Sequence, residues 1–411
     1  MLSNFFFNLI QKFISFKRSR FYHFIKSIIF PFVIKNVSKL FNSKINENLI
    51  VMGAYGGGGF VDNTKYLFEF LNKKSKYTLV WIAKLKSVRK LLREIGFNVV
   101  SMYSLQAIKI LRRAKYIFIT HNYEDILPIE FSNGSTIILT WHGLPIKNVE
   151  VNLKESFIYN KWGDIFHLKL KNDDYIDYLL SQSSNENDVN ILSSQLKIAP
   201  NKIISLGYPR NDILFNKNDK LIENIKNNYD IPYNVQQVFL YAPTFRSNRT
   251  FTLPLSESDI INLNKILKEI NSILILKPHM ITERVRFENY ENIKVLDKKT
   301  DFQELLLISD VLISDYSGAW IDYLLTLKPI LIFTYDLNNY RKKKGLNYNL
   351  NDIAPGPILY NANELFDAIK NIDIIDKNYK QKREEIRDRF NDFKDGDSTK
   401  RILDFLKIKY E

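Results

Sequence analysis

Two successive runs of alternating strand and helix signals constrain the fold of this chain. The first run covers residues 49–206, and the second covers residues 238–333. In both runs, short apolar segments alternate with segments that have the apolar periodicity of a helix, an order that produces parallel sheets covered by helices. We therefore predict an α/β protein with two parallel-sheet domains, which agrees with a length of 411 residues at about 150 residues per domain.

The segment GYPRND, at residues 207–212, is the predicted boundary between the two domains. Glycine and proline interrupt regular structure there, and a stretch rich in lysine and asparagine follows as far as Tyr233. We therefore predict a first domain at residues 46–206 and a second at residues 207–385. Residues 1–45 then form a leader, and residues 386–411 form a C-terminal helix.

The leader combines basic residues with large apolar ones. It carries eight lysines and arginines, and the first acidic residue of the chain is Glu47. Basic residues interrupt each candidate span of about 20 apolar residues, so the leader cannot cross a bilayer as a helix. A signal peptide is also disfavoured, because no small-residue cleavage site follows. We predict amphipathic helices that lie in an anionic membrane surface; the alternative is that they pack onto the protein's own core.

The overall composition indicates a folded protein with anionic partners. Apolar residues make up 45% and charged residues 25%, and the formal net charge is +14. Such a charge suits nucleic acid, anionic lipid or phosphorylated substrates. The chain has no cysteine, which excludes disulfides, thiolate metal sites and a cysteine nucleophile.

A glycine-rich loop at residues 53–59 follows the first predicted strand. It lacks the lysine and serine or threonine that end a P-loop, and Val61 stands where a dinucleotide-binding loop has its third glycine. We therefore interpret it as a flexible loop at the mouth of a cleft.

Two histidines follow predicted strands of the first domain, namely His121 and His142. Ligands of parallel sheets bind beyond the carboxyl ends of strands. The segment around His142 is the more informative: its imidazole can accept a hydroxyl proton at neutral pH, Gly143 lets a ligand approach the backbone, and Lys147 supplies positive charge. A histidine at a strand end can equally be structural.

Polar residues also follow the predicted strands of the second domain: Arg246, Lys277, His279, Ser314 and Ser317. Their convergence at one sheet edge is what a nucleotide-diphosphate pocket requires. In the segment LISDYSGAWIDYLL, at residues 312–325, a strand is followed by a polar turn and the start of a helix. The hydroxyls of Ser314 and Ser317 and the amide of Gly318 could hold a diphosphate. Alternatively, one serine simply caps the helix.

Eight motifs in register resemble the CDP-glycerol glycerophosphotransferase family, which includes teichoic-acid primases and polymerases and related capsule enzymes. The motifs are TWHGLPIK, GYPRND, YAPTFR, LKPH, ISDYSGAWIDYLL, KPILIFTYD, PGP and KDGDSTKRI. The resemblance implies a GT-B-like fold, in which two Rossmann-like domains face each other across a cleft. It also implies that residues 46–206 bind the acceptor, that residues 207–385 bind a CDP-alditol, and that the C-terminal helix crosses back to the first domain.

The resemblance further implies the reaction and the roles of site residues. Family members transfer glycerol or ribitol phosphate from a CDP-alditol to a hydroxyl of a membrane-linked glycan and release CMP. It assigns catalytic roles to His142 and His279, and the grip on the diphosphate to residues 314–318. We place Gly143 and Lys147 on the acceptor side. The donor-binding assignments are Thr244, Arg246, Lys277, Ser314, Asp315, Ser317 and Gly318. Many relatives carry a serine where this chain has Gly318.

We expect in-line displacement, with His142 taking the acceptor proton and the second domain stabilising the leaving CMP. No metal or other cofactor is expected, because Asp315 and Asp322 belong to no dense carboxylate cluster and basic residues can neutralise the diphosphate. We also expect Arg210 and Asp212 to form an ion pair. The expected location is peripheral, at the cytoplasmic face of the bacterial cell membrane.

Four other functions stay open at this point. The donor could be CDP-ribitol, or a nucleotide sugar used by a GT-B glycosyltransferase. A nucleic-acid-binding protein would fit the charge, but the sequence has no recognised module for it, so we expect no nucleic-acid partner. A non-catalytic membrane-surface protein would not explain the two histidines. The sequence does not choose between teichoic acid and capsule, or between one addition and polymerisation.

Overall fold

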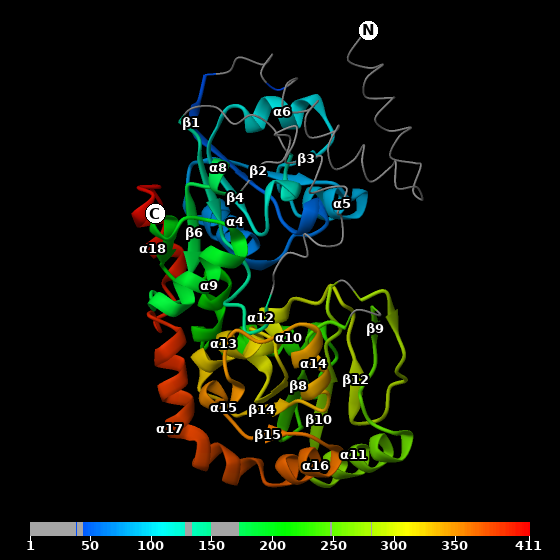
Figure 1. The fold of residues 1–411 in the computed structure, drawn as a ribbon. Helices are drawn as coiled ribbons and strands as arrows, with labels where there is room; N and C mark the ends of the chain where they lie inside the picture. Colours follow the sequence, from blue (N-terminus) through cyan, green and yellow to red (C-terminus); the bar gives the residue numbers. More distant parts are fainter. Residues whose placement is uncertain (1–37, 39–43, 128–133, 149–171, 247–248, 281) are drawn as a thin grey trace, which may run out of the picture.

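The computed structural model describes residues 38, 44–127, 134–148, 172–246, 249–280 and 282–411. These residues form two α/β units, which Figure 1 shows one above the other. Nearly all of the leader lies outside the described residues. The prediction that it contacts a membrane therefore concerns residues that lie outside the described ones. Within the described ranges, no helix has the length and apolar character needed to cross a bilayer.

The first unit is built on a seven-stranded sheet of order β3-β2-β1-β4-β5-β6-β7, whose strand pairings are parallel. Its strands are β1 (Asn46–Met52), β2 (Thr78–Ala83), β3 (Val99–Ser101), β4 (Ala114–Ile119), β5 (Thr136–Leu139), β6 (Tyr178–Ser181) and β7 (Ile203–Ser205). The connecting helices are η2 (Tyr55–Gly57), α4 (Asp62–Lys74), α5 (Lys86–Glu94), α6 (Leu105–Leu111), η3 (Tyr123–Asp125), α8 (Asn172–Tyr175), α9 (Glu186–Leu196), η5 (Pro200–Lys202) and η6 (Pro209–Phe215).

The second unit contains a six-stranded parallel sheet of order β12-β10-β8-β13-β14-β15. Its strands are β8 (Gln237–Tyr241), β10 (Ser272–Leu276), β12 (Ile293–Val295), β13 (Val311–Ser314), β14 (Ile330–Phe333) and β15 (Ile358–Leu359). A two-stranded ribbon joins β9 (Thr250–Phe251) to β11 (Arg284–Val285). The helices are α10 (Asp219–Asn228), α11 (Glu257–Glu269), α12 (Phe302–Ile308), α13 (Ala319–Tyr323), η7 (Leu324–Thr326), α14 (Leu337–Lys343), α15 (Leu350–Ile353), α16 (Ala362–Lys370), α17 (Ile372–Phe390) and α18 (Ser398–Phe405).

Local sequence explains most of these elements. Strand β10 is apolar after its first residue, Ser272, and all of its residues are buried, as a strand covered on both faces requires. Helix α11 begins with a capping box formed by Ser256 and Asp259, and Asp301 accepts two backbone N–H bonds at the start of α12. The prediction of an α/β protein with two parallel sheets is confirmed.

Two helices form in segments that are mostly polar. The lysine- and asparagine-rich stretch after residue 212 contains α10, where Asn218 accepts the Leu221 N–H and Ile225 is buried. The basic segment after β14 contains α14, which is anchored by Tyr340 stacking on Tyr316 at a centroid distance of 4.0 Å. In both helices a cap or one buried residue is enough to fix a segment that is otherwise polar.

The end of the chain returns to the first unit. Helix α17 runs along the second unit, and α18 lies beside the first, at the red end of the chain in Figure 1. Ile402 and Leu403 of α18 share a buried cluster with Trp81 of β2. The Tyr116 hydroxyl donates to the Leu406 carbonyl at 2.8 Å. The predicted C-terminal helix is thus two helices, separated by residues 391–397.

Candidate active site

A cavity of about 630 Å³ lies between the two units, a size typical of small-molecule sites. Its walls consist of segments that follow strand ends. The first unit contributes residues after β1, β4 and β5, and the second contributes residues after β8, β10 and β13. Of the predicted site residues, the cavity is lined by His142, Gly143, Lys147, Thr244, Lys277, His279, Ser317 and Gly318.

The loop after β5 holds His142 in a constrained backbone. Trp141 has a φ of +52° and Gly143 a φ of +122°, a conformation that favours glycine. The Asn63 amide donates to the carbonyls of Thr140 and Trp141, at 3.2 and 2.8 Å. Arg210 donates to the His142 carbonyl at 2.9 Å. These bonds fix the backbone on both sides of the His142 side chain and so fix the orientation of its Cα–Cβ bond.

The imidazole of His142 is held in its neutral form. Burial lowers its pKa well below the ordinary value, and the positive charges of Arg210 and Lys147 lower it further. Its Nδ1 atom is buried and has no hydrogen-bond partner within the described part of the chain. The ring also stacks on His121, with centroids 4.6 Å apart and planes at 25°. A neutral imidazole in this position can accept a proton from a ligand.

Lys277 and His279 follow β10 on the opposite wall. The Lys277 ammonium donates to the carbonyls of Lys298 and Pro278, at 2.7 and 3.1 Å, which leaves one of its three protons for a ligand. Burial lowers the pKa of Lys277 to about 8, although Asp301 and Asp297 oppose that shift. Burial, followed by the charges of Lys147 and Lys277, lowers the pKa of His279 to about 4.

Lys147 completes the positive charge from the first unit's side. Its pKa is lowered, chiefly by burial, although the Asp315 carboxylate opposes the shift. The backbone around Lys147 pairs with residues 345–347 of the second unit: Asn347 N donates to Ile146 O at 2.9 Å, and Asn148 N donates to Gly345 O at 3.2 Å. The two units are therefore joined by backbone hydrogen bonds at the edge of the cavity.

Arg246 and Asp315 lie behind the cavity wall, so their placement does not support direct contact with a donor. Arg246 binds Asp315 at 2.9 Å, Asp336 at 3.0 Å and the Thr244 carbonyl at 2.6 Å. Asp315 also accepts the Thr244 N–H at 2.7 Å. Together they hold the turn after β8, and Thr244 lines the cavity from that turn. Asp315 thus orients the backbone of this turn.

Ser314 is also placed away from the cavity. It is fully buried, and its hydroxyl donates to the Ala242 carbonyl at 2.9 Å. Ser317 does line the cavity, but its hydroxyl accepts the Ala319 N–H at 3.2 Å, so it also caps α13. The predicted diphosphate turn therefore presents Ser317 and Gly318 to a ligand, while Ser314 supports the neighbouring strand.

The structure accounts for a glycine at position 318. A Cβ atom there would lie 2.7 Å from the Leu144 carbonyl oxygen, which belongs to the His142 loop of the other unit. The serine that the resemblance leads us to expect at this position has no room in this arrangement. The missing side chain lets the two walls of the cavity approach each other.

The predicted ion pair between Arg210 and Asp212 is wrong. Arg210 instead binds Asp62 at 2.8 Å and Asp322 at 2.7 Å, one from each unit. Burial alone would lower its pKa, but these two carboxylates raise it above the ordinary value. Asp212 accepts the N–H groups of Ser398 and Thr399, at 2.9 and 2.8 Å, and so caps α18.

Several residues of the site were not assigned from the sequence. His121 lines the cavity, although only its position after a predicted strand pointed to it. Lys65 and Tyr66 of α4 bind Asp301 of the second unit, at 2.6 and 2.8 Å. Their sequence signal is that of an ordinary helix face. Among the described residues, no three histidine or carboxylate side chains converge as metal ligands.

Comparisons of the sequence find a matching family and several related proteins. The model of the CDP-Glycerol:Poly(glycerophosphate) glycerophosphotransferase family matches residues 35–407. The teichoic acid glycerol-phosphate transferase of Staphylococcus aureus (strain NCTC 8325 / PS 47) is 29% identical over 372 residues, or 89% of this chain and 94% of that protein. The teichoic acid poly(glycerol phosphate) polymerase of Bacillus spizizenii is 30% identical over 375 residues, or 88% and 92%.

Solved structures resemble the fold over the same extent. A structure of the wall teichoic acid polymerase TagF matches with a TM-score of 0.76 and 26% identity, covering 92% of each chain. A TagF variant soaked with CDPG for 30 minutes matches with a TM-score of 0.74 and 25% identity, covering 90% of this chain and 91% of that one. The predicted GT-B-like fold is confirmed by these matches.

Proposed function

Because the chain belongs to the CDP-glycerol:poly(glycerophosphate) glycerophosphotransferase family, we propose that it transfers glycerol phosphate from CDP-glycerol to a hydroxyl of a membrane-linked glycan in teichoic acid synthesis. The family match confirms the family that was predicted from the motifs. The observation that carries the proposal is the cavity itself, because His142 of one unit and Lys277 and His279 of the other line the same space.

The proposed reaction is an in-line displacement at the phosphorus on the glycerol side of the donor. The acceptor oxygen forms a bond to that phosphorus, while the bond from phosphorus to the CMP oxygen breaks and CMP leaves with the electron pair. The acceptor proton passes to His142. Phosphoryl transfer asks a protein mainly for positioning and countercharge, and both are available here.

The second unit supplies most of the countercharge. Lys277, His279 and the Gly318 amide are the proposed contacts of the diphosphate, with Thr244 and Ser317 beside them. Lys147 approaches from the first unit. The pKa values of Lys147, Lys277 and His279 are all lowered, which is expected where buried basic groups have too few anionic partners. A bound diphosphate would raise these pKa values, and by linkage protonation of these groups would favour donor binding.

We propose that this transfer needs no metal cofactor, because the basic side chains can take over the neutralising role that a cation would have. The test is transfer activity measured before and after treatment with a chelator. Retained activity supports the proposal. Loss of activity that returns on adding a divalent cation contradicts it.

The acceptor and the location of the protein are further parts of the proposal. The basic, aromatic-rich leader would hold the protein on the cytoplasmic face of the cell membrane, where a lipid-linked glycan acceptor is accessible. Deleting residues 1–44 should weaken sedimentation with anionic vesicles, while transfer to a soluble acceptor analogue remains. Unchanged vesicle binding would contradict this role for the leader.

The reaction is tested by incubating the full-length protein with CDP-glycerol and a lipid-linked acceptor. The expected result is release of CMP together with an acceptor enlarged by one or more glycerol phosphate units. UDP or GDP release from a nucleotide sugar, with no turnover of CDP-glycerol, would contradict the proposal. CDP-ribitol in a parallel reaction measures the preference for the alditol.

A further inference from the structure

A short chain of polar groups behind His121 is the feature that the proposed reaction does not yet use. Asp125 accepts the Thr120 hydroxyl at 2.9 Å, and it also accepts the backbone N–H groups of Thr120 and His121, at 2.8 and 2.7 Å. The Thr120 hydroxyl oxygen lies 2.7 Å from Nδ1 of His121. The carboxylate, the hydroxyl and the imidazole therefore form one connected row that ends at the cavity.

This row determines which nitrogen of His121 can accept a hydrogen bond. The Thr120 hydroxyl has a single proton, which it gives to Asp125. Toward His121 it can only accept, so Nδ1 carries the hydrogen of the neutral ring. The other nitrogen, Nε2, then has a free lone pair. The backbone N–H of Tyr55 also donates to the Thr120 oxygen, at 3.2 Å, which agrees with the acceptor role of that oxygen.

The ring of His121 is also held in place by its neighbours. It stacks on His142 with centroids 4.6 Å apart, and the Tyr55 ring meets it edge-on at the same centroid distance. Both imidazoles line the cavity. In His142 the Nδ1 atom is buried, so Nε2 is the nitrogen available to a ligand. Two nearly parallel rings thus offer two acceptor nitrogens to one ligand.

We propose that His121 accepts a hydrogen bond from a second hydroxyl of the acceptor substrate, on the carbon next to the one whose hydroxyl attacks. The preferred acceptor would therefore end in a vicinal diol, as a terminal glycerol phosphate unit does. This inference rests on the proposed function, in which His142 takes the proton of the attacking hydroxyl. Fixing two neighbouring hydroxyls limits rotation about the bond between them and so aligns the attacking oxygen.

The test compares two soluble acceptor analogues in the full-length protein. One ends in glycerol phosphate, and the other ends in 3-hydroxypropyl phosphate, which lacks the secondary hydroxyl. The wild-type protein should use the diol with a kcat/KM about tenfold higher, the usual scale for one positioned hydrogen bond. His121→Phe keeps an aromatic ring for stacking but has no nitrogen. It should reduce this preference to near unity, mainly by raising KM for the diol.

A matched pair of variants tests the supporting row. Thr120→Ser retains a hydroxyl and should keep the preference for the diol, whereas Thr120→Val removes the group that fixes the tautomer and should reduce it. Damage to the fold would lower the rates with both analogues equally and would leave their ratio unchanged. The ratio of the kcat/KM values for the two analogues therefore does not change if Thr120 has only a structural role.

The outcomes separate this inference from the proposed function. If the wild-type protein releases no CMP from CDP-glycerol with either analogue, the proposed function fails and the inference fails with it. If the wild-type protein transfers glycerol phosphate but uses both analogues equally, only the inference is overturned. It is also overturned if His121→Phe keeps the wild-type preference, or if it slows both reactions by the same factor.

Discussion

The two walls of the cavity differ in the chemistry that they offer to a ligand. The wall from the first unit presents stacked imidazoles, His121 and His142, on a backbone held by Asn63 and Arg210. The wall from the second unit presents the Lys277 ammonium and His279, with the turn at Gly318 beside them. One wall is arranged to accept protons, and the other is arranged to meet negative charge.

This difference explains why the reaction needs both units. A hydroxyl becomes a better nucleophile beside a neutral base. Burial, followed by positive neighbours, favours the neutral form of the His142 imidazole by lowering its pKa. CMP leaves more easily where fixed donors meet the charge that grows on its phosphate. The following variants test the division between the walls, and they are ordered from the largest expected effect to the smallest.

Arg210 joins the walls, so its loss should have the largest effect. Arg210→Met leaves the buried carboxylates of Asp62 and Asp322 without their cation, which typically costs about 3–5 kcal/mol. We expect a decrease of that size in the free energy of unfolding, measured by urea denaturation. A decrease below about 1 kcal/mol, the scale of a surface pair, would show that the ion pairs do not hold the walls together.

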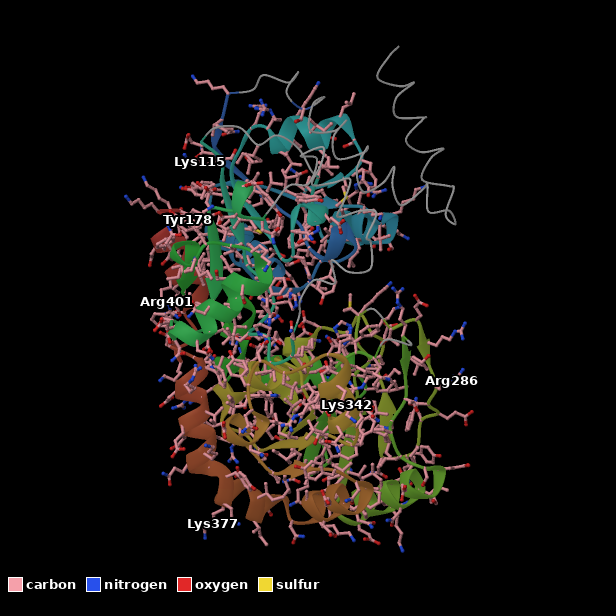
Figure 2. All side chains as sticks on the ribbon, in the orientation of Figure 1. Lys115, Tyr178, Arg286, Lys342, Lys377 and Arg401 are labelled. Atoms are coloured by element: carbon pink, nitrogen blue, oxygen red, sulfur yellow. The ribbon has the colours of Figure 1, made fainter. Side chains whose placement is uncertain are left out.

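The matched control for that variant is an arginine on the surface. Arg286 is exposed and does not line the cavity, and Figure 2 shows it at the outer edge of the second unit. Arg286→Met should change the free energy of unfolding by no more than about 0.5 kcal/mol. A loss equal to that of Arg210→Met would mean that the urea experiment does not report on the junction between the units.

The proton-accepting wall is tested by His142→Ala. We expect kcat to fall at least about 100-fold, the usual scale for removing a positioned base, while the Kd for CDP-glycerol stays within about threefold. Single-turnover rates and calorimetric binding of the donor measure the two quantities. Near-wild-type turnover would remove His142 from the mechanism. A large loss of donor affinity would show that His142 binds the donor and would contradict its assignment to the proton-accepting wall.

His279→Ala tests the charge-stabilising wall in the complementary way. Its turnover should also fall by about 100-fold, but here donor binding should weaken as well, because His279 lies beside the proposed diphosphate site. The expected pattern is a loss in kcat together with a higher donor Kd. An unchanged Kd with reduced kcat would move His279 from donor binding to proton transfer alone.

The pH dependence of donor binding tests Lys277. Its pKa of about 8 means that the ammonium is charged below about pH 7 and loses its proton as the pH rises through 8. The charged form attracts the anionic donor, so the Kd for CDP-glycerol should change little near pH 7 and rise up to about tenfold per unit above pH 8. Lys277→Met should weaken binding at pH 7 by about tenfold and abolish the alkaline rise. A wild-type Kd that is flat to pH 9.5 would contradict the assignment.

Local sequence predicted the strands and the edge of the sheets at which the site lies, because both depend on short-range signals. The bounds of β10 follow from an apolar run, and the start of α12 follows from the Asp301 cap. His142 and His279 could be assigned because each belongs to a motif placed directly after a strand. Strand ends of a parallel sheet converge whatever the rest of the chain does.

Long-range contacts explain what the sequence could not predict. Arg210 lies close in sequence to Asp212, yet its actual partner Asp62 is 148 residues away. The orientation of Ser314 depends on the Ala242 carbonyl of the neighbouring strand end, and the need for a glycine at position 318 depends on Leu144 of the other unit. A local sequence pattern does not reveal contacts between residues that are far apart in the chain. Ser314, Arg246 and Asp315 were therefore predicted to bind the donor, whereas in the structure they stabilise the fold around the cavity.

The most direct test of the two-wall arrangement is a structure of the full-length protein with CDP-glycerol bound. The account predicts a diphosphate within hydrogen-bond distance of Lys277, His279 and the Gly318 amide, with the phosphorus on the glycerol side facing His142. A nucleotide bound outside this cavity, or bound with its diphosphate against the histidines of the first unit and away from Lys277, would contradict it.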